Sequence, residues 1–241
     1  MVKAVFFDMY ETLVSLYKVE PYLGFHISRD MGVPEPVFRK VWDPSEAERT
    51  VGKSTTEGII ERIMRENGVY SKELYDKIIA KRCASQRGAF AKLNGEIIPM
   101  LEALKKRGIK LGVISNCFSE EAMIIKESAL AAYFDVLCLS YDMGVCKPDV
   151  RIFEKALDEI SRVSDSKILP QDCLFVGDGG SSELQASSSF GMKAVQAVWY
   201  INESLKLPIP GIESKVSKIM PEFPQAETPM EILGQMSRFG G

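Results

Sequence analysis

The sequence predicts an α/β protein in which helices cover both faces of a parallel sheet and a helical insertion interrupts the core. Three observations support this prediction. Short apolar runs alternate with amphipathic segments after Gly95, polar clusters follow the apolar runs, and residues 15–87 show helical spacing without a convincing strand. Such alternation is typical of strands that are joined by helices and lie parallel in one sheet.

The first expected strand, residues 2–7, is a continuous apolar run rich in Val and Phe that ends at Asp8. A run without polar alternation indicates a strand that is buried on both faces. This strand is therefore expected near the middle of the sheet, with Asp8 at its carboxyl end.

Residues 15–87 have a different sequence pattern, in which apolar residues recur at the spacing of a helix. Gly and Pro residues separate the helical pieces. The recurring apolar positions are Ile59, Ile60, Ile63, Met64, Leu74, Ile78 and Ile79, and the breaks are Gly32, Pro34, Pro36 and Gly68. We therefore expect a helical insertion after the first strand.

From Gly95 onward, helices and strands are expected in turn. The helices are predicted over residues 97–107, 120–128, 150–160 and 182–190, and the strands over residues 111–114, 134–139, 174–176 and 192–198. Residues 204–229 are rich in Pro, Ser and charge and are predicted to form an ordered loop region. A closing helix is predicted over residues 230–239.

Length, charge and composition exclude several classes of protein. The 241 residues suit one large α/β domain, or a core with a small insertion. The net charge of −3 lacks the basic excess that a nucleic-acid-binding surface needs. No apolar run approaches the ~20 residues of a membrane helix, and the N-terminus lacks a signal-peptide pattern. We expect a soluble, cytoplasmic protein with no nucleic-acid or membrane partner; the oligomeric state cannot be read from the sequence.

The chain contains one histidine, His26. Ser-His and Cys-His catalytic pairs and multi-histidine metal sites need imidazoles that this chain does not have. His26 itself has the apolar neighbours Phe25 and Ile27, which favours a structural or surface role. The chemistry of the protein is therefore expected from carboxylates, a lysine, hydroxyl groups and a hard metal ion.

Four polar clusters lie where the expected strands end, namely residues 8–12, 115–116, 147–148 and 177–180. In open α/β sheets the active site lies at the carboxyl ends of the strands. Asp8 and Asp178 would converge there, and two such carboxylates stay ionised only with a cation between them. Oxygen ligands of this kind favour Mg²⁺.

Lys147, Ser115 and Thr12 would complete an electrophilic site around Asp8. A lysine can neutralise both an aspartate and a phosphate, and hydroxyl groups can donate to phosphoryl oxygens. Each residue also has a plainer interpretation, a solvated lysine in the first case and turn or helix-cap roles in the other two. Together they suit phosphoryl transfer to an aspartyl nucleophile.

Four segments, in order, resemble the motifs of the haloacid dehalogenase-like hydrolases. They are residues 7–13 (FDMYETL), 113–116 (VISN), 144–153 (GVCKPDVRIF) and 175–183 (FVGDGGSSE). The resemblance implies a Rossmann-like core over residues 1–14 and 88–241 and a helical cap over residues 15–87. It also implies that Asp8 is the nucleophile, that Lys147 is catalytic, that Thr12, Ser115 and Asn116 bind phosphate, and that Asp178 binds the metal. Such caps open and close over a small-molecule substrate.

Two positions depart from the pattern of this family. Phosphatases of the family usually carry an aspartate two residues after the nucleophile, as general acid and base, where this chain has Tyr10. The loss of that proton transfer commonly costs a factor of about 10²–10⁴. The backbone carbonyl of Tyr10 could still bind the metal. Glu183 stands where many members have aspartate, and it is expected to orient metal-bound water from the outer shell.

Three functions remain open at this point. The first is a magnesium-dependent phosphatase that acts on a small phosphorylated metabolite through an aspartyl-phosphate on Asp8. The second is a metal-independent 2-haloacid dehalogenase, which Tyr10 favours and which would need a cap arginine, with Arg39 as candidate, to bind the halide. Asp178 and Gly179 oppose it, because such dehalogenases tend to carry Ser and Asn in the fourth motif. The third is a non-catalytic member that binds a phosphorylated ligand.

Overall fold

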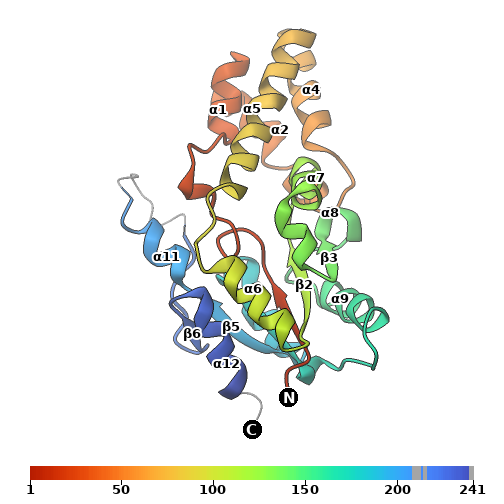
Figure 1. The fold of residues 1–241 in the computed structure, drawn as a ribbon. Helices are drawn as coiled ribbons and strands as arrows, with labels where there is room; N and C mark the ends of the chain where they lie inside the picture. Colours follow the sequence, from red (N-terminus) through yellow and green to blue (C-terminus); the bar gives the residue numbers. More distant parts are fainter. Residues whose placement is uncertain (208–212, 214–215, 239–241) are drawn as a thin grey trace.

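The computed structural model describes residues 1–207, 213 and 216–238. In this part of the chain, six strands form one parallel sheet with the order β3-β2-β1-β4-β5-β6 (Figure 1). The strands are β1 (Ala4–Phe7), β2 (Lys110–Ser115), β3 (Val136–Leu139), β4 (Cys173–Gly177), β5 (Lys193–Ala197) and β6 (Gln225–Ala226). The predicted α/β class with a parallel sheet is confirmed.

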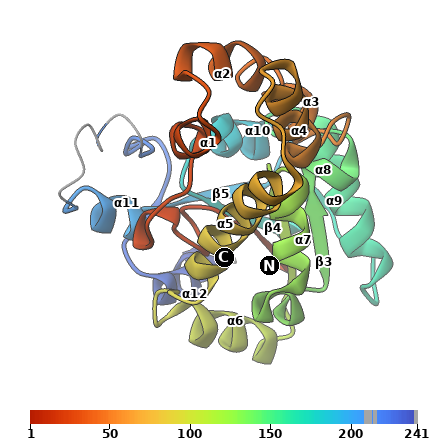
Figure 2. The same cartoon turned by 90° about the horizontal axis from the view of Figure 1, so that it is seen from above.

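Helices cover both faces of the sheet, because successive strand residues point to opposite faces and present apolar side chains on each. In β1, Val5 and Phe7 belong to the apolar cluster that includes side chains of α6 (Ile97–Lys106), α7 (Ser119–Glu127) and α12 (Ile232–Arg238). Ala4 and Phe6 belong to the opposite cluster, which includes side chains of α9 (Val150–Arg162) and α10 (Glu183–Ser189). The view from above in Figure 2 shows these two helical layers on either side of the strands.

The last part of the chain differs from the prediction. Residues 204–229 were expected to be loop, but Gln225–Ala226 pairs with β5 as strand β6. Two short helices were not predicted, α8 (Ser140–Met143) and α11 (Trp199–Ser204). The expected closing helix is α12, preceded by a 3₁₀ turn at Pro229–Glu231, and residue 239 of that prediction lies outside the described residues.

The insertion after β1 is helical, as predicted, and it forms a cap above the sheet (Figure 1). Its helices share an apolar core of their own, to which Phe38, Ile63 and Ile78 contribute. They are α1 (Gly24–Met31), α2 (Glu35–Trp42), α3 (Glu46–Thr50), α4 (Thr56–Glu66) and α5 (Lys72–Phe90). Since α5 continues past residue 87, the division of the chain at residues 14/15 and 87/88 stays a prediction.

Short-range signals account for the ends of the cap helices. The hydroxyls of Thr55 and Ser71 accept hydrogen bonds from the first turns of α4 and α5, respectively. Gly32 follows α1 in the left-handed region at φ 74°, where a side chain would be strained. The sequence of the cap therefore encodes the ends of its helices as well as the burial of their apolar residues.

The carboxyl ends of the strands face the cap (Figure 1). The strand order reverses at β1, because the chain continues to β2 and β3 on one side and later to β4, β5 and β6 on the other. A crevice forms at such a reversal in open α/β sheets, and ligands bind there. Asp8 directly follows β1 at this point. Among the described residues, no helix combines the length and the apolar character needed to cross a membrane.

Candidate active site

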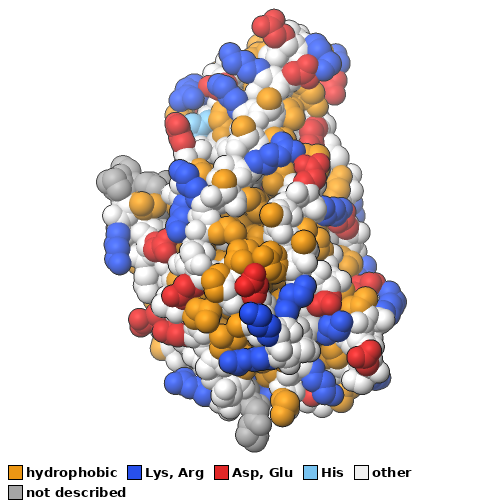
Figure 3. Space-filling model, viewed as in Figure 1, with side chains coloured by type: hydrophobic (Ala, Val, Ile, Leu, Met, Phe, Trp, Pro, Cys, Tyr) orange, Lys and Arg blue, Asp and Glu red, His pale blue; other side chains and the backbone are white. Residues whose placement is uncertain are grey.

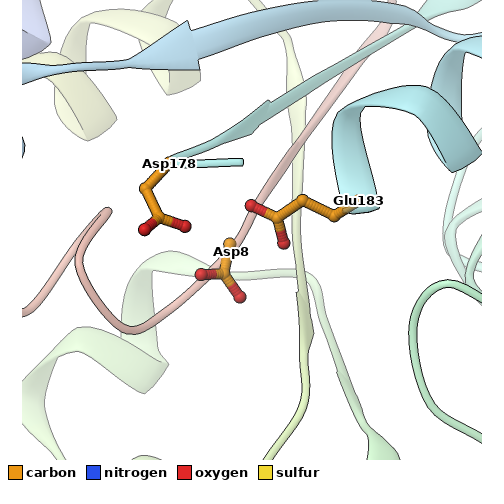
Figure 4. Close-up of side chains that lie close together, drawn as sticks. All are labelled: Asp8, Asp178 and Glu183. Carbon is orange, nitrogen blue, oxygen red and sulfur yellow. The ribbon is translucent and has the colours of Figure 1, made fainter. Parts of the chain in front are cut away.

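Three carboxylates of the described residues converge at the carboxyl edge of the sheet. Asp8 follows β1, Asp178 follows β4, and Glu183 begins α10 (Figure 4). Each offers an oxygen atom within 4.8 Å of the others. Asp8 and Asp178 are each 7% exposed and Glu183 is 1% exposed, so water shields their mutual repulsion poorly. Buried like charges at this spacing need a compensating cation.

Lys147 supplies part of that compensation. Its ammonium group donates to Asp8 Oδ1 at 2.5 Å and also to Glu183 Oε2, and the residue is 4% exposed. Burial alone would lower the pKa of Lys147, but Asp8 and Glu183 together raise it above its usual value. Lys147 therefore carries a fixed positive charge beside Asp8.

One lysine does not balance three carboxylates. Burial raises the pKa of Asp8. The charge of Lys147 only partly offsets this rise, and the charge of Asp178 raises the pKa further. Burial and the charge of Asp8 likewise raise the pKa of Glu183 well above its usual value. An additional cation would favour the ionised form of each group. The arrangement thus offers oxygen ligands to a divalent metal ion and carries an excess of negative charge that the ion would neutralise.

Asn116 holds the backbone of Lys147. Its side-chain Oδ1 accepts from Lys147 N at 2.8 Å and its Nδ2 donates to Lys147 O at 3.0 Å. The peptide bond between Lys147 and Pro148 is cis. The amide group of Asn116 thus fixes the position from which Lys147 reaches Asp8, and its predicted contact with phosphate stays a prediction.

The carboxylate of Glu183 has protein partners on both of its oxygen atoms. Its Oε1 accepts from Gly179 N at 3.2 Å, while Oε2 binds Lys147. This position requires Gly177, because a Cβ atom there would lie 2.0 Å from Glu183 Oε1. Glu183 shares Lys147 with Asp8, and its expected place in the outer shell of a metal ion stays a prediction.

Gly177→Ala is therefore expected to displace Glu183 and to lower the free energy of unfolding by about 1–3 kcal/mol, the usual cost of overpacking. Urea unfolding measures the loss. Gly234→Ala is the matched control, since nothing lies within 4 Å of its added methyl group in α12. That change should instead stabilise the helix by about 0.5–1 kcal/mol. Equal effects at both positions would contradict the close contact at Gly177.

Two hydroxyl groups predicted to bind phosphate belong to Thr12, in the segment that follows β1, and to Ser115, at the end of the neighbouring strand β2. Thr12 Oγ1 is buried and has no hydrogen-bond partner among the described residues. Buried hydroxyls are rarely left unpaired, so this atom is available to a ligand oxygen. Ser115 ends β2 and is fully buried, and its hydroxyl donates to Asn116 O at 3.3 Å.

The side chain of Tyr10 has no carboxyl group to offer to the site. Its hydroxyl is buried without a hydrogen-bond partner in the described part of the chain, and its ring contacts Phe90 at the end of α5. Burial raises the pKa of Tyr10 well above its usual value, and the charge of Glu121 raises it further. Tyr10 was predicted to take part in catalysis and to bind the metal through its backbone carbonyl, and both roles stay predictions.

The cap is joined to the core by a buried ion cluster. Arg82 of α5 donates to Glu120 at 3.0 Å and to Glu121 at 2.8 Å, both in α7, and Gln86 also binds Glu121. These side chains are at most 9% exposed. The cluster places α5 against the helix that follows the Ser115–Asn116 segment.

Arg39, the candidate halide ligand, lies on α2 of the cap. It binds Glu35 at 3.2 Å and Asp43 at 3.1 Å, and its side chain is 41% exposed. A cavity of about 610 Å³ lies between residues 43–53 of the cap and Asn116 and Cys146 of the core. Arg39 does not line it, so the structure gives this residue no contact with the site.

Two residues that sequence analysis missed contact Asp178. Gln196 of β5 donates to its backbone carbonyl at 2.9 Å, and the hydroxyl of Ser217 donates to its Oδ2 at 2.6 Å. Gln196 had a recognisable signal, a polar residue inside an apolar strand. Ser217 had none, since it lies 39 residues from Asp178 in a polar loop.

Comparisons with known proteins agree with this fold. A family model described as haloacid dehalogenase-like hydrolase matches residues 2–191. The chain is similar to a 2-haloacid dehalogenase from Pseudomonas syringae pv. Tomato DC3000, at 19% identity over 100% of both chains with a TM-score of 0.67. It is also similar to a HAD phosphatase from Thermococcus onnurineus, at 19% identity over 98% of both chains with a TM-score of 0.62. These likenesses show the shared fold.

Three curated relatives show how the similarity is distributed. Phosphoglycolate phosphatase from Aquifex aeolicus is 24% identical over 86% of this chain and 90% of its own length. Pyrimidine 5′-nucleotidase YjjG from Escherichia coli is 28% identical over 50% of this chain and 48% of its own. Rhythmically expressed gene 2 protein from Drosophila melanogaster is 34% identical over 36% and 33%, respectively. The chain thus aligns with half or less of the last two proteins.

Proposed function

This chain belongs to the haloacid dehalogenase-like hydrolase family, and from that premise we propose that it is a magnesium-dependent phosphatase of a small phosphorylated metabolite. The observation that carries the proposal is the buried group of Asp8, Asp178 and Glu183 with Lys147 as its cationic partner. Its excess of negative charge suits a divalent cation and, beside it, a phosphate group.

Asp8 and Asp178 would hold the metal ion through carboxylate oxygens, with the backbone carbonyl of Tyr10 as a further ligand. Bound there, Mg²⁺ would neutralise charge on the phosphoryl oxygens. Glu183 is buried next to these ligands and would orient water around the metal. The donor set contains only oxygen atoms, as Mg²⁺ prefers.

The protein groups suit a two-step transfer. A carboxylate oxygen of Asp8 attacks phosphorus, so that an oxygen–phosphorus bond to Asp8 forms while the ester bond to the leaving group breaks. Lys147 stays protonated and stabilises charge on both Asp8 and the phosphoryl group. Thr12 and Ser115 are the candidate donors to phosphoryl oxygens. Water then hydrolyses the aspartyl-phosphate and releases inorganic phosphate.

Proton delivery limits the substrates that such a site would turn over quickly. Tyr10 offers no carboxyl group to serve as general acid and base, and its phenol hydroxyl is buried with a pKa well above the usual value. Substrates with good leaving groups would suffer least from this loss. The phosphatase names among the relatives support phosphate esters as the substrate class.

The proposal is tested by hydrolysis of p-nitrophenyl phosphate with Mg²⁺ and with excess EDTA. Turnover should fall by about 100-fold or more in EDTA and return when Mg²⁺ is restored, because metal ions contribute several kcal/mol to such transition states. Asp178→Ala should show the same loss with Mg²⁺ present. Undiminished turnover in EDTA would refute the dependence on magnesium.

A 2-haloacid dehalogenase is the second candidate, and Tyr10 together with the dehalogenase fold neighbour favours it. It is distinguished by halide release from 2-chloropropionate in excess EDTA. The ion pairs of Arg39 with Glu35 and Asp43 and the presence of Asp178 oppose this activity. Halide release without phosphate release would replace the phosphatase proposal. Thermal stabilisation by phosphate esters without turnover would instead support a ligand-binding member.

A further inference from the structure

A segment near the C-terminus, residues 216–220, lies against the loop that carries Asp178; we call it the strap. The hydroxyl of Ser217 donates to Asp178 Oδ2 at 2.6 Å. The other carboxylate oxygen, Oδ1, accepts from Gly180 N at 3.0 Å. Both oxygens of Asp178 therefore have a protein donor, which limits rotation of the carboxylate about its side-chain bonds.

Gln196 ties the strap to the same loop. Its Nε2 donates to Asp178 O at 2.9 Å and to Lys218 O at 2.7 Å, while its Oε1 accepts from Met220 N at 2.8 Å. Gln196 can reach both because it pairs in register with Gly177, the residue before Asp178. The side chain is fully buried, so these bonds are made without competing water.

Gly179 shows how closely the loop and the strap pack. It adopts φ +100°, which disfavours any residue with a side chain. A Cβ atom at this position would lie 3.0 Å from Met220 Cε and 3.3 Å from Gln196 Nε2. The absence of a side chain at Gly179 is what lets the strap lie directly on the Asp178 loop.

We propose that Ser217 of the strap and Gln196 of β5 are positioning residues that orient Asp178 toward the cation of the metal site. This inference rests on the proposed function. A carboxylate oxygen has more than one lone pair, so it can accept from Ser217 and still face a metal ion. Groups that orient metal ligands in this way commonly change metal affinity by 10–100-fold when they are removed.

The first test is calorimetric titration of the full chain with Mg²⁺ alone, without substrate. Ser217→Ala should weaken binding by about 10-fold or more, because Asp178 loses the donor that fixes its orientation. Ser217→Thr retains the hydroxyl and should restore most of the affinity. Ile219→Ala is the matched control in the strap, since Ile219 is 44% exposed. Unchanged or tighter binding by Ser217→Ala would overturn the proposal.

The second test needs no metal. Amide hydrogen exchange at Gly180 should become faster in Ser217→Ala, because its acceptor Asp178 becomes more mobile, and stay unchanged in Ile219→Ala. Equal exchange in parent and Ser217→Ala would refute the positioning role. If the parent binds no Mg²⁺ yet exchange at Gly180 rises in Ser217→Ala, the metal part of the proposed function fails while the contact of the strap with Asp178 is upheld.

Discussion

Asp8→Asn should lower the turnover of p-nitrophenyl phosphate by a factor on the order of 10⁴–10⁶, the scale seen when a catalytic nucleophile is removed. Asparagine has almost the same shape as aspartate, but its amide group is a poor nucleophile. Asp8 also lies where a nucleophile is needed, at the end of β1 and in contact with Lys147. The measurement is the steady-state rate with saturating Mg²⁺.

Asp142→Asn is the control for this experiment. Asp142 pairs with Lys126 on the surface, where the side chains are 37% and 49% exposed, respectively. It is not one of the residues proposed to act in the site. Its rate should stay within about twofold of the parent rate, as expected for a surface pair of small energetic effect. Circular dichroism of Asp8→Asn establishes that the variant is folded. A folded Asp8→Asn that keeps a tenth of the parent rate would exclude Asp8 as the nucleophile.

Lys147→Met should lower the free energy of unfolding in EDTA by about 3–5 kcal/mol, the cost of removing one partner from a buried ion pair. Methionine fills a similar volume but leaves Asp8, Asp178 and Glu183 without a cationic neighbour. Burial makes their repulsion strong. Urea unfolding of the parent and the variant in EDTA gives the difference directly.

Adding Mg²⁺ should recover part of the stability lost in Lys147→Met, because the metal would replace the missing positive charge. Turnover should stay low, since the charge beside Asp8 is absent during the transfer. Lys126→Met is the control; its exposed pair with Asp142 should contribute at most about 1 kcal/mol. Similar losses for the two lysines, or no recovery with Mg²⁺, would contradict the charge balance inferred for the site.

Much of the architecture followed from local sequence patterns. Continuous apolar runs predicted five of the strands, and 3.6-residue spacing predicted the helical cap. The approach of Asp8, Asp178 and Lys147 also followed, because parallel strands bring their carboxyl ends to one edge wherever they lie in the sequence. These features depend on periodicity and on strand direction, and both can be read without knowledge of side-chain packing.

Other features depended on contacts between distant segments. Strand β6 has only two residues and takes its conformation from pairing with β5, so its own sequence carries no strand pattern. The hydroxyl of Tyr10 is buried where cap and core meet, and no periodicity in the sequence predicts that environment.

Figure 3 shows Lys and Arg side chains interspersed with Asp and Glu over the face seen in Figure 1, so charge on this face gives no direct pointer to the site. The sequence by itself determined the fold class and the helical cap and predicted Asp8, Asp178 and Lys147 as reactive groups, because each of these is encoded by short-range pattern. Only the tertiary structure decided that Glu183 reaches Lys147 and that Gln196 and Ser217 hold Asp178. Those contacts join residues up to 39 positions apart, and packing of the whole chain determines which of them form.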